Sequence, residues 1–171
     1  MNETTQQYMS RITGYVAGKD HFAVLRATPK TLGKLLRGKP ARALSRKPDP
    51  DKWSVAEILA HIAESELVIS YRLRVVLGSN GTTIQAFDQN AWQSNATALI
   101  KDPKRAEALF RTLRENNIAL LRSIPKEQWD YFGMHQERGK ETVARIVEMT
   151  AGHDVNHLRQ IEAMIGTKRA K

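Results

Sequence analysis

Two histidines four residues apart stand near the end of the chain. The segment from Thr150 to Arg159 reads TAGHDVNHLR and contains His153 and His157. Side chains four positions apart project from the same side of a helix, roughly 6 Å apart. Two imidazoles at this separation can both reach one divalent metal ion at ~2.0–2.1 Å. The pair therefore indicates a metal site, and the simpler alternative is a pair of hydrogen-bonded core histidines.

A catalytic metal site needs a further ligand, because such zinc sites use three protein ligands and leave one position open. His61 is the best candidate, since it lies at the edge of an apolar helical stripe, three residues after Ile58 and four before the small Ser65. We expect His21 and His135 to be ordinary surface histidines. His135 keeps the alternative of lining the mouth of a site, because it shortly precedes the segment with the histidine pair.

Three acids lie beside these histidines in the sequence. Glu64 and Glu66 follow His61, and Asp154 follows His153. A carboxylate can orient a ligating imidazole by accepting its other N–H, but spacing alone assigns this role to none of the three. We expect each to be exposed and to pair with the many lysines and arginines.

Four long segments with helical periodicity must position these residues. They cover about residues 20–36, 55–77, 103–124 and 142–165, after a shorter segment at 6–16. Ser54 and Glu57 form a capping box before the second segment, and Asp102-Pro103 begins the third. Thr28-Pro29 is a possible break in the first. In the last segment the core-facing series is Ile146, Thr150, His153, His157, Ile161 and Met164.

Strand alternation is scarce, so the pattern predicts an all-α four-helix bundle. Residues 1–171 should form a single domain, with its core at about 20–166 between a short N-terminal extension and a basic C-terminal tail. We expect a loop with a short helix at 84–99, and a connection with at most one helical turn at 125–142. The predicted core residues are Val55, Ile58, Ile62, Leu109, Phe110, Leu113, Ile146 and Ile161.

Composition excludes several classes of protein. The chain has no cysteine, which removes disulfides, cysteine-ligated zinc and a cysteine nucleophile. Its N-terminus is polar, and no apolar run approaches the ~18 residues of a membrane span, so we expect a cytoplasmic protein without a membrane partner. The net charge is +9, but the densest basic stretch, Lys34–Lys47, lacks aromatic residues for base stacking. A solvated basic surface is therefore favoured over nucleic-acid binding.

Three stretches of the sequence resemble the DinB-like superfamily, which includes the YfiT-like proteins. They are DKWSVAEILAHIAESE (Asp51–Glu66), FDQNAW (Phe87–Trp92) and ERGKETVARIVEMTAGHDVNHLRQI (Glu137–Ile161). The resemblance implies an up-down-down-up four-helix bundle, often a homodimer. It also implies a divalent metal ion, commonly zinc or nickel, held by three histidines, which by motif are His61, His153 and His157.

Two functions fit this reading. The first is a metal-dependent enzyme that acts on a small electrophilic substrate, either as a hydrolase or as a transferase for a low-molecular-weight thiol such as bacillithiol or mycothiol. The second is a non-catalytic stress-response module that binds a metal or a small ligand. A basic helical protein that contacts nucleic acid is a third hypothesis, and metal content would separate it from the other two.

Overall fold

The structure, a computed structural model, describes residues 3–165. Most of the chain is helical. In chain order the elements are α1 (Thr5–Gly14), α2 (His21–Leu36), α3 (Ala41–Leu44), α4 (Val55–Gly78), β1 (Thr82–Ile84), α5 (Gln89–Asn95), α6 (Thr97–Lys101), α7 (Pro103–Ser123), η1 (Lys126–Asp130), β2 (Phe132–His135), β3 (Gly139–Thr142) and α8 (Val143–Ile165). The basic tail lies outside the described residues.

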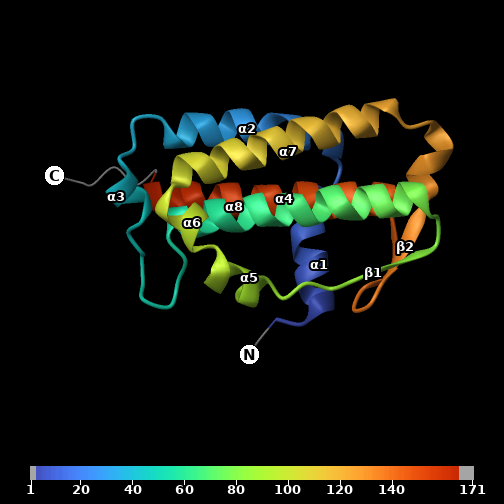
Figure 1. Cartoon of the computed structure of the whole chain (residues 1–171), viewed down its shortest axis with the longest axis horizontal. Coiled ribbons are helices and arrows are strands. Elements are labelled where there is room, and N and C mark those ends of the chain that lie inside the picture. Colours follow the sequence, from blue (N-terminus) through green and yellow to red (C-terminus); the bar gives the residue numbers. More distant parts are fainter. Residues whose placement is uncertain (1–2, 166–171) are drawn as a thin grey trace.

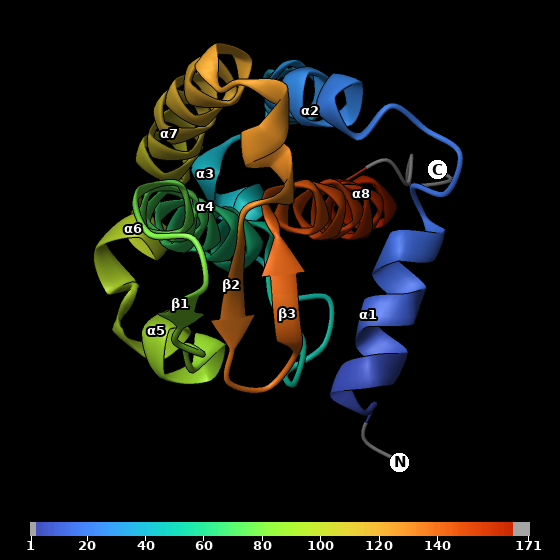
Figure 2. The ribbon, with the colours of Figure 1, turned by 90° about the vertical axis from the view of Figure 1, so that its right-hand side faces the viewer.

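The four long helices α2, α4, α7 and α8 form a bundle, as the sequence predicts. Figure 1 shows that α2 and α8 run in one direction and that α4 and α7 run in the other, which is the up-down-down-up order. In the end view of Figure 2, α4 and α8 lie side by side beneath α7 and α2. Because α4 and α7 are parallel, residues 79–102 must return along the bundle, and β1, α5 and α6 lie on this crossover.

The helix starts follow the capping signals in the sequence. The Ser54 hydroxyl accepts a hydrogen bond from the Glu57 N–H, and the Glu57 carboxylate accepts one from the Ser54 N–H. Asp102 caps α7, with Pro103 in the first turn. These caps satisfy backbone N–H groups that have no partner within the helix, so the starts of both helices are fixed locally.

The possible break at Thr28-Pro29 is absent, and α2 continues through Pro29. Proline cannot donate a hydrogen bond to the carbonyl four residues earlier, which is that of Leu25. Arg114 of α7 replaces that donor, because its Nη1 lies 3.3 Å from the Leu25 oxygen. A contact from another helix therefore satisfies the carbonyl group that Pro29 leaves free. Residue spacing in the sequence does not predict this contact.

The predicted core is largely confirmed, with α7 as the exception. Leu109 is 37% exposed and Leu113 is only half-buried, so the prediction for Leu109 was wrong. The buried face of α7 instead carries Ala106, Phe110, Arg114, Asn117 and Leu121. Two of these buried residues, Arg114 and Asn117, are polar. A prediction that follows only apolar residues therefore assigns the wrong face of α7 to the core.

A small sheet joins the bundle at the end where α4 stops. β1 pairs with β2 in parallel, and β2 pairs with β3 in an antiparallel hairpin. The strands have only three or four residues each, too few for a recognisable alternation, so the sequence predicted only a connection here. The hairpin matters because it presents His135 and Glu141 beside α4 and α8.

The N-terminal helix α1 packs across α8 (Figure 2). The close approach requires Gly152, because a Cβ atom there would collide with the backbone of the buried Ile12. The segment that was expected to be a short N-terminal extension is therefore packed on the bundle, where α1 lines part of a pocket. Among the residues that the structure describes, no helix is long and apolar enough to cross a membrane.

Candidate metal centre and its pocket

Three histidines meet where α4 packs against α8. His61 Nε2 lies 3.0 Å from His153 Nε2, and His157 Nε2 lies 3.1 Å from the same atom. One ligand atom from each ring falls within 4.8 Å of the other two. His61 comes from α4, and His153 and His157 lie one turn apart on α8. The structure thus brings together the three residues selected from the sequence.

The spacing of these nitrogens fits a shared divalent ion. Two nitrogens that each lie ~2.0–2.1 Å from one ion, at tetrahedral or octahedral angles, are about 2.9–3.4 Å apart. Both of the nitrogen–nitrogen separations given above fall in that range. A neutral imidazole has one donor and one acceptor nitrogen. Three Nε2 atoms that point at one another therefore cannot all form good hydrogen bonds among themselves. An ion at their centre would satisfy all three.

Burial keeps these imidazoles neutral. His61 and His157 are 4% and 7% exposed. Burial, followed by the charge of His157, lowers the pKa of His61 to about 3. Burial likewise lowers the pKa of His157 to about 4 and is the main reason that the pKa of His153 lies well below its ordinary value. At pH 7 all three rings are therefore neutral, which is the form that binds metal.

The partner that orients an imidazole is an amide rather than a carboxylate. His157 Nδ1 lies 2.9 Å from Gln160 Oε1. If this nitrogen donates to the amide oxygen, Nε2 is left with a free lone pair directed at the other histidines. Trp53 borders the cluster on the α4 side, with its ring centroid 4.9 Å from that of His61. The sequence offered no spacing signal for Gln160, because one-turn contacts are common on any helix.

None of the three neighbouring acids has the exposed position that was predicted from the sequence. Glu66 and Asp154 are 1% and 3% exposed rather than on the surface, and both pair with the buried Arg114. Asn117 donates to Glu66 at 2.8 Å, and Thr28 donates to Asp154 at 2.7 Å. Glu64 is half-buried, and burial raises its pKa.

This polar network draws on all four bundle helices, and its residue Asp154 is the next residue after His153 on α8. Burial by itself lowers the pKa of Arg114, but the charges of Asp154 and Glu66 outweigh it and raise that pKa. Arg114 therefore stays cationic within the core. It holds α4 and α8, which carry the histidines, at a fixed separation.

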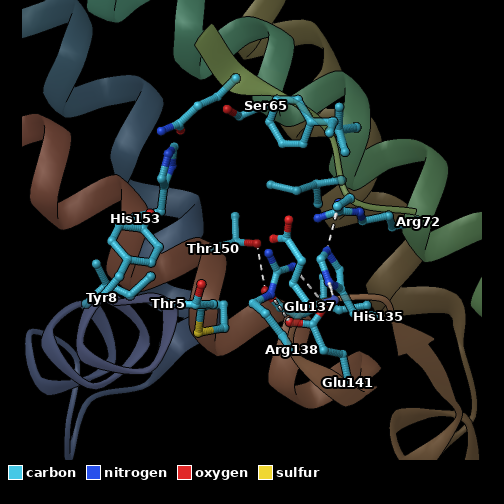
Figure 3. Close-up of a pocket in the computed structure, with 18 of the residues that line it drawn as sticks. Thr5, Tyr8, Ser65, Arg72, His135, Glu137, Arg138, Glu141, Thr150 and His153 are labelled. Carbon is cyan, nitrogen blue, oxygen red and sulfur yellow. Dashed lines mark hydrogen bonds and ion pairs between the residues drawn. The ribbon is translucent and has the colours of Figure 1, made fainter. Parts of the chain in front are cut away.

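A pocket of about 740 Å³ opens onto the cluster. His61 and His153 line it, together with side chains from α1, α4, α8, residues 86–89 and the β2–β3 hairpin. In Figure 3, His153 and Ser65 face Arg72 and His135 across this space. The Ser65 hydroxyl is buried without a hydrogen-bond partner. It lies one helical turn from His61, so a bound molecule could use it.

The two remaining histidines have different outcomes. His21 is half-buried, and its Nε2 lies 3.3 Å from the Val16 carbonyl oxygen, outside the cluster. The surface prediction for His135 was wrong, because this residue is only 3% exposed. It lines the pocket, which agrees with the alternative placement at the mouth of a site.

Residues 25–161 match the model of the DinB superfamily. Because that match covers more than half of the chain, the chain belongs to this superfamily, and the resemblance noted in the sequence is confirmed.

Two relatives carry a provisional assignment as metal-dependent hydrolases. OB0413 of Oceanobacillus iheyensis is 28% identical over 131 residues, which cover 77% of this chain and 75% of that protein. YfiT of Bacillus subtilis is 25% identical over 111 residues, which cover 64% of this chain and 62% of YfiT. The solved structure of YfiT matches with a TM-score of 0.77 at 19% identity, covers 98% of this chain and 92% of that chain, and is described as an unusual four-helix bundle. That similarity confirms the fold.

Proposed function

We propose that this chain is a metal-dependent enzyme in which His61, His153 and His157 hold one divalent ion at the inner end of the pocket. The observation that carries the proposal is the convergence of three neutral imidazoles, two buried and one half-buried, on one point that borders a cavity. Imidazole ligands suit both zinc and nickel, which are the metals that we propose. The relatives assigned as metal-dependent hydrolases support the same class.

When bound, the ion would supply a Lewis acid that lowers the pKa of a thiol or of water. The chain contributes the surroundings of that chemistry. Three neutral ligands leave the charge of the ion uncompensated, and Ile69, Ile146 and Met149 contribute apolar side chains to the lining of the pocket. The Ser65 hydroxyl is free to donate a hydrogen bond to a substrate beside His61.

In the lining of the pocket, the described residues of the helices that carry the histidines offer no carboxylate to activate a water molecule. The carboxylates that line the pocket, Glu3, Asp88, Glu137 and Glu141, all come from other segments. A hydrolase commonly uses such a group as a general base, whereas a thiol ionises more readily without one. We therefore propose a transferase that joins a low-molecular-weight thiol to a small electrophile, with hydrolysis as the second candidate. The homodimer and the cytoplasmic location stay predictions.

The test is a panel of small electrophiles, assayed with bacillithiol, mycothiol and glutathione, and a matched panel of hydrolysable esters and amides without thiol. We expect turnover by the metal-loaded protein that falls at least about 100-fold after chelation or in His61→Ala, because ligand loss removes the Lewis acid. His21→Ala, outside the cluster, is the matched control and should keep full activity. Activity that survives both chelation and His61→Ala contradicts the proposal. Inactivity across both panels would favour the non-catalytic module instead.

A further inference from the structure

Arg72 lies at the other end of the pocket from His61 and His153, and it has no acidic partner within ion-pair distance. It is 7% exposed, and none of the ion pairs among the described residues includes it. Its hydrogen bonds both come from Nη2, which donates to the Gln85 carbonyl oxygen at 2.7 Å and lies 3.2 Å from His135 Nε2. Its Nε is buried without any partner. A buried cation without a directly paired counter-charge is costly, so the Arg72 guanidinium keeps hydrogen-bonding capacity for a bound anionic group.

His135 cannot supply the missing acceptors. The Glu137 N–H points at its Nδ1 from 3.2 Å, while Arg72 approaches its Nε2. A neutral imidazole can accept at only one nitrogen, so one of these two contacts sets a donor against a donor. If Nδ1 accepts from Glu137, then Nε2 carries a hydrogen that, like the Arg72 guanidinium, needs an acceptor. An anion oxygen beside the two side chains could accept a hydrogen bond from each of them.

Two carboxylates, Glu141 and Glu137, lie near Arg72 and act to raise its pKa, but neither forms an ion pair with it among the described residues. Arg138 forms a two-pronged pair with Glu141, at 2.6 and 3.0 Å, so the Glu141 carboxylate is already engaged. Glu137 lines the pocket but does not appear in any ion pair that the structure describes. Burial, followed by the charge of Arg138, lowers the pKa of Arg72 to about 10, which still leaves the guanidinium protonated at pH 7.

We propose that Arg72 and His135 form an anion subsite, which binds a carboxylate or phosphate group of the molecule whose reacting end lies at the three histidines. As a statement about the substrate, this inference rests on the proposed function. Anion binding by Arg72 and His135 does not itself require the metal.

The separation of the two ends limits the size of the ligand. His61 and Arg72 are both on α4 and both line the pocket, and the eleven helical steps from one position to the other correspond to about 16 Å of helix rise. A molecule that touches both ends must be extended, with its anionic group remote from its reacting atom. A single small anion would fill only the Arg72 end.

The subsite can be tested by NMR titration of metal-free protein with inorganic phosphate and, separately, with acetate, at constant ionic strength. Two signals report on the subsite: the side-chain Nε–H of Arg72 and the backbone amide of Glu137. We expect saturable shifts in both with at least one anion. In Arg72→Gln the dissociation constant from the Glu137 signal should rise at least about tenfold, because a charge-assisted hydrogen-bonding partner is lost.

Three variants complete the test. Arg72→Lys keeps the positive charge but loses the planar guanidinium group, so it should bind the anion with intermediate affinity. This variant replaces Arg72→Gln in the test if Arg72→Gln does not fold. Glu137→Gln removes a competing negative charge and should tighten binding about twofold. Arg105→Gln makes the same change in net charge on an exposed part of α7, and its dissociation constant should stay within about twofold of the wild-type value.

The His153→Ala, His157→Ala double variant separates this inference from the proposed metal chemistry. Anion binding that persists in the double variant supports the subsite, and the anion that binds there identifies the group as phosphate or carboxylate. Binding that disappears in the double variant, or that is unchanged in Arg72→Gln, overturns the inference. So does the absence of a saturable shift with either anion.

Discussion

Replacing Arg114 with methionine should lower the free energy of unfolding by about 3–5 kcal/mol, the usual cost of breaking a buried ion pair from one side. For a chain of this length that loss corresponds to a fall of roughly 6–20 °C in the melting temperature. Methionine retains an unbranched apolar chain in place of the aliphatic part of arginine, so most of the effect arises from the lost charge and hydrogen bonds.

The size of this effect follows from what Arg114 holds. Its guanidinium donates to both oxygens of Glu66, at 2.9 and 2.7 Å, and to both oxygens of Asp154. It also donates to the Leu25 carbonyl oxygen, which Pro29 leaves without its helical partner. Without Arg114, two carboxylates and one carbonyl group stay buried with fewer donors.

Urea denaturation of metal-free protein measures the change. Arg105→Met is the matched control, because Arg105 is exposed on the same helix, and its free energy of unfolding should change by less than about 0.5 kcal/mol. Adding Glu66→Gln and Asp154→Asn to Arg114→Met should recover part of the loss, since the stranded charges are removed. An Arg114→Met protein as stable as the wild type would contradict this account of the core.

A divalent ion should stabilise the wild-type protein strongly. At a zinc or nickel concentration one hundred times the dissociation constant, the free energy of unfolding should rise by about 2.7 kcal/mol, because only the folded chain brings the three histidines together. The melting temperature should rise by roughly 5–11 °C. Thermal denaturation with and without a chelator measures the effect.

The same titration on variants assigns the stabilisation to the three histidines. In the His153→Ala, His157→Ala double variant the ion should produce no such rise, because a single imidazole is left. His21→Ala should respond as the wild type does, since His21 lies outside the cluster. An equal rise in the double variant would place the ion elsewhere in the chain.

The sequence was sufficient for the bundle and for the histidine cluster because both depend on local periodicity. His153 and His157 lie on the core side of α8 through their four-residue spacing. The capping box at Ser54 fixes where α4 begins and hence which face carries His61. Once α4 and α8 pack together, the three rings must approach one another.

The sequence was insufficient where long-range polar contacts decide burial. From the sequence alone, Glu66 and Asp154 resemble surface acids. Their burial depends on Arg114 of α7, which is 48 and 40 positions away along the chain. His135 is buried because a hairpin of very short strands carries it against Arg72 on α4. Neither pairing leaves a periodic signal, since each partner is brought in by tertiary structure.

The most direct test of the proposed metal centre is elemental analysis of protein purified without chelator, with the wild type and the His153→Ala, His157→Ala double variant prepared in parallel. The proposed centre predicts close to one equivalent of zinc or nickel per wild-type chain and almost none in the double variant, since one remaining imidazole cannot hold the ion. Full occupancy in the double variant, or a wild-type chain that stays without metal even after zinc and nickel are supplied, would contradict it.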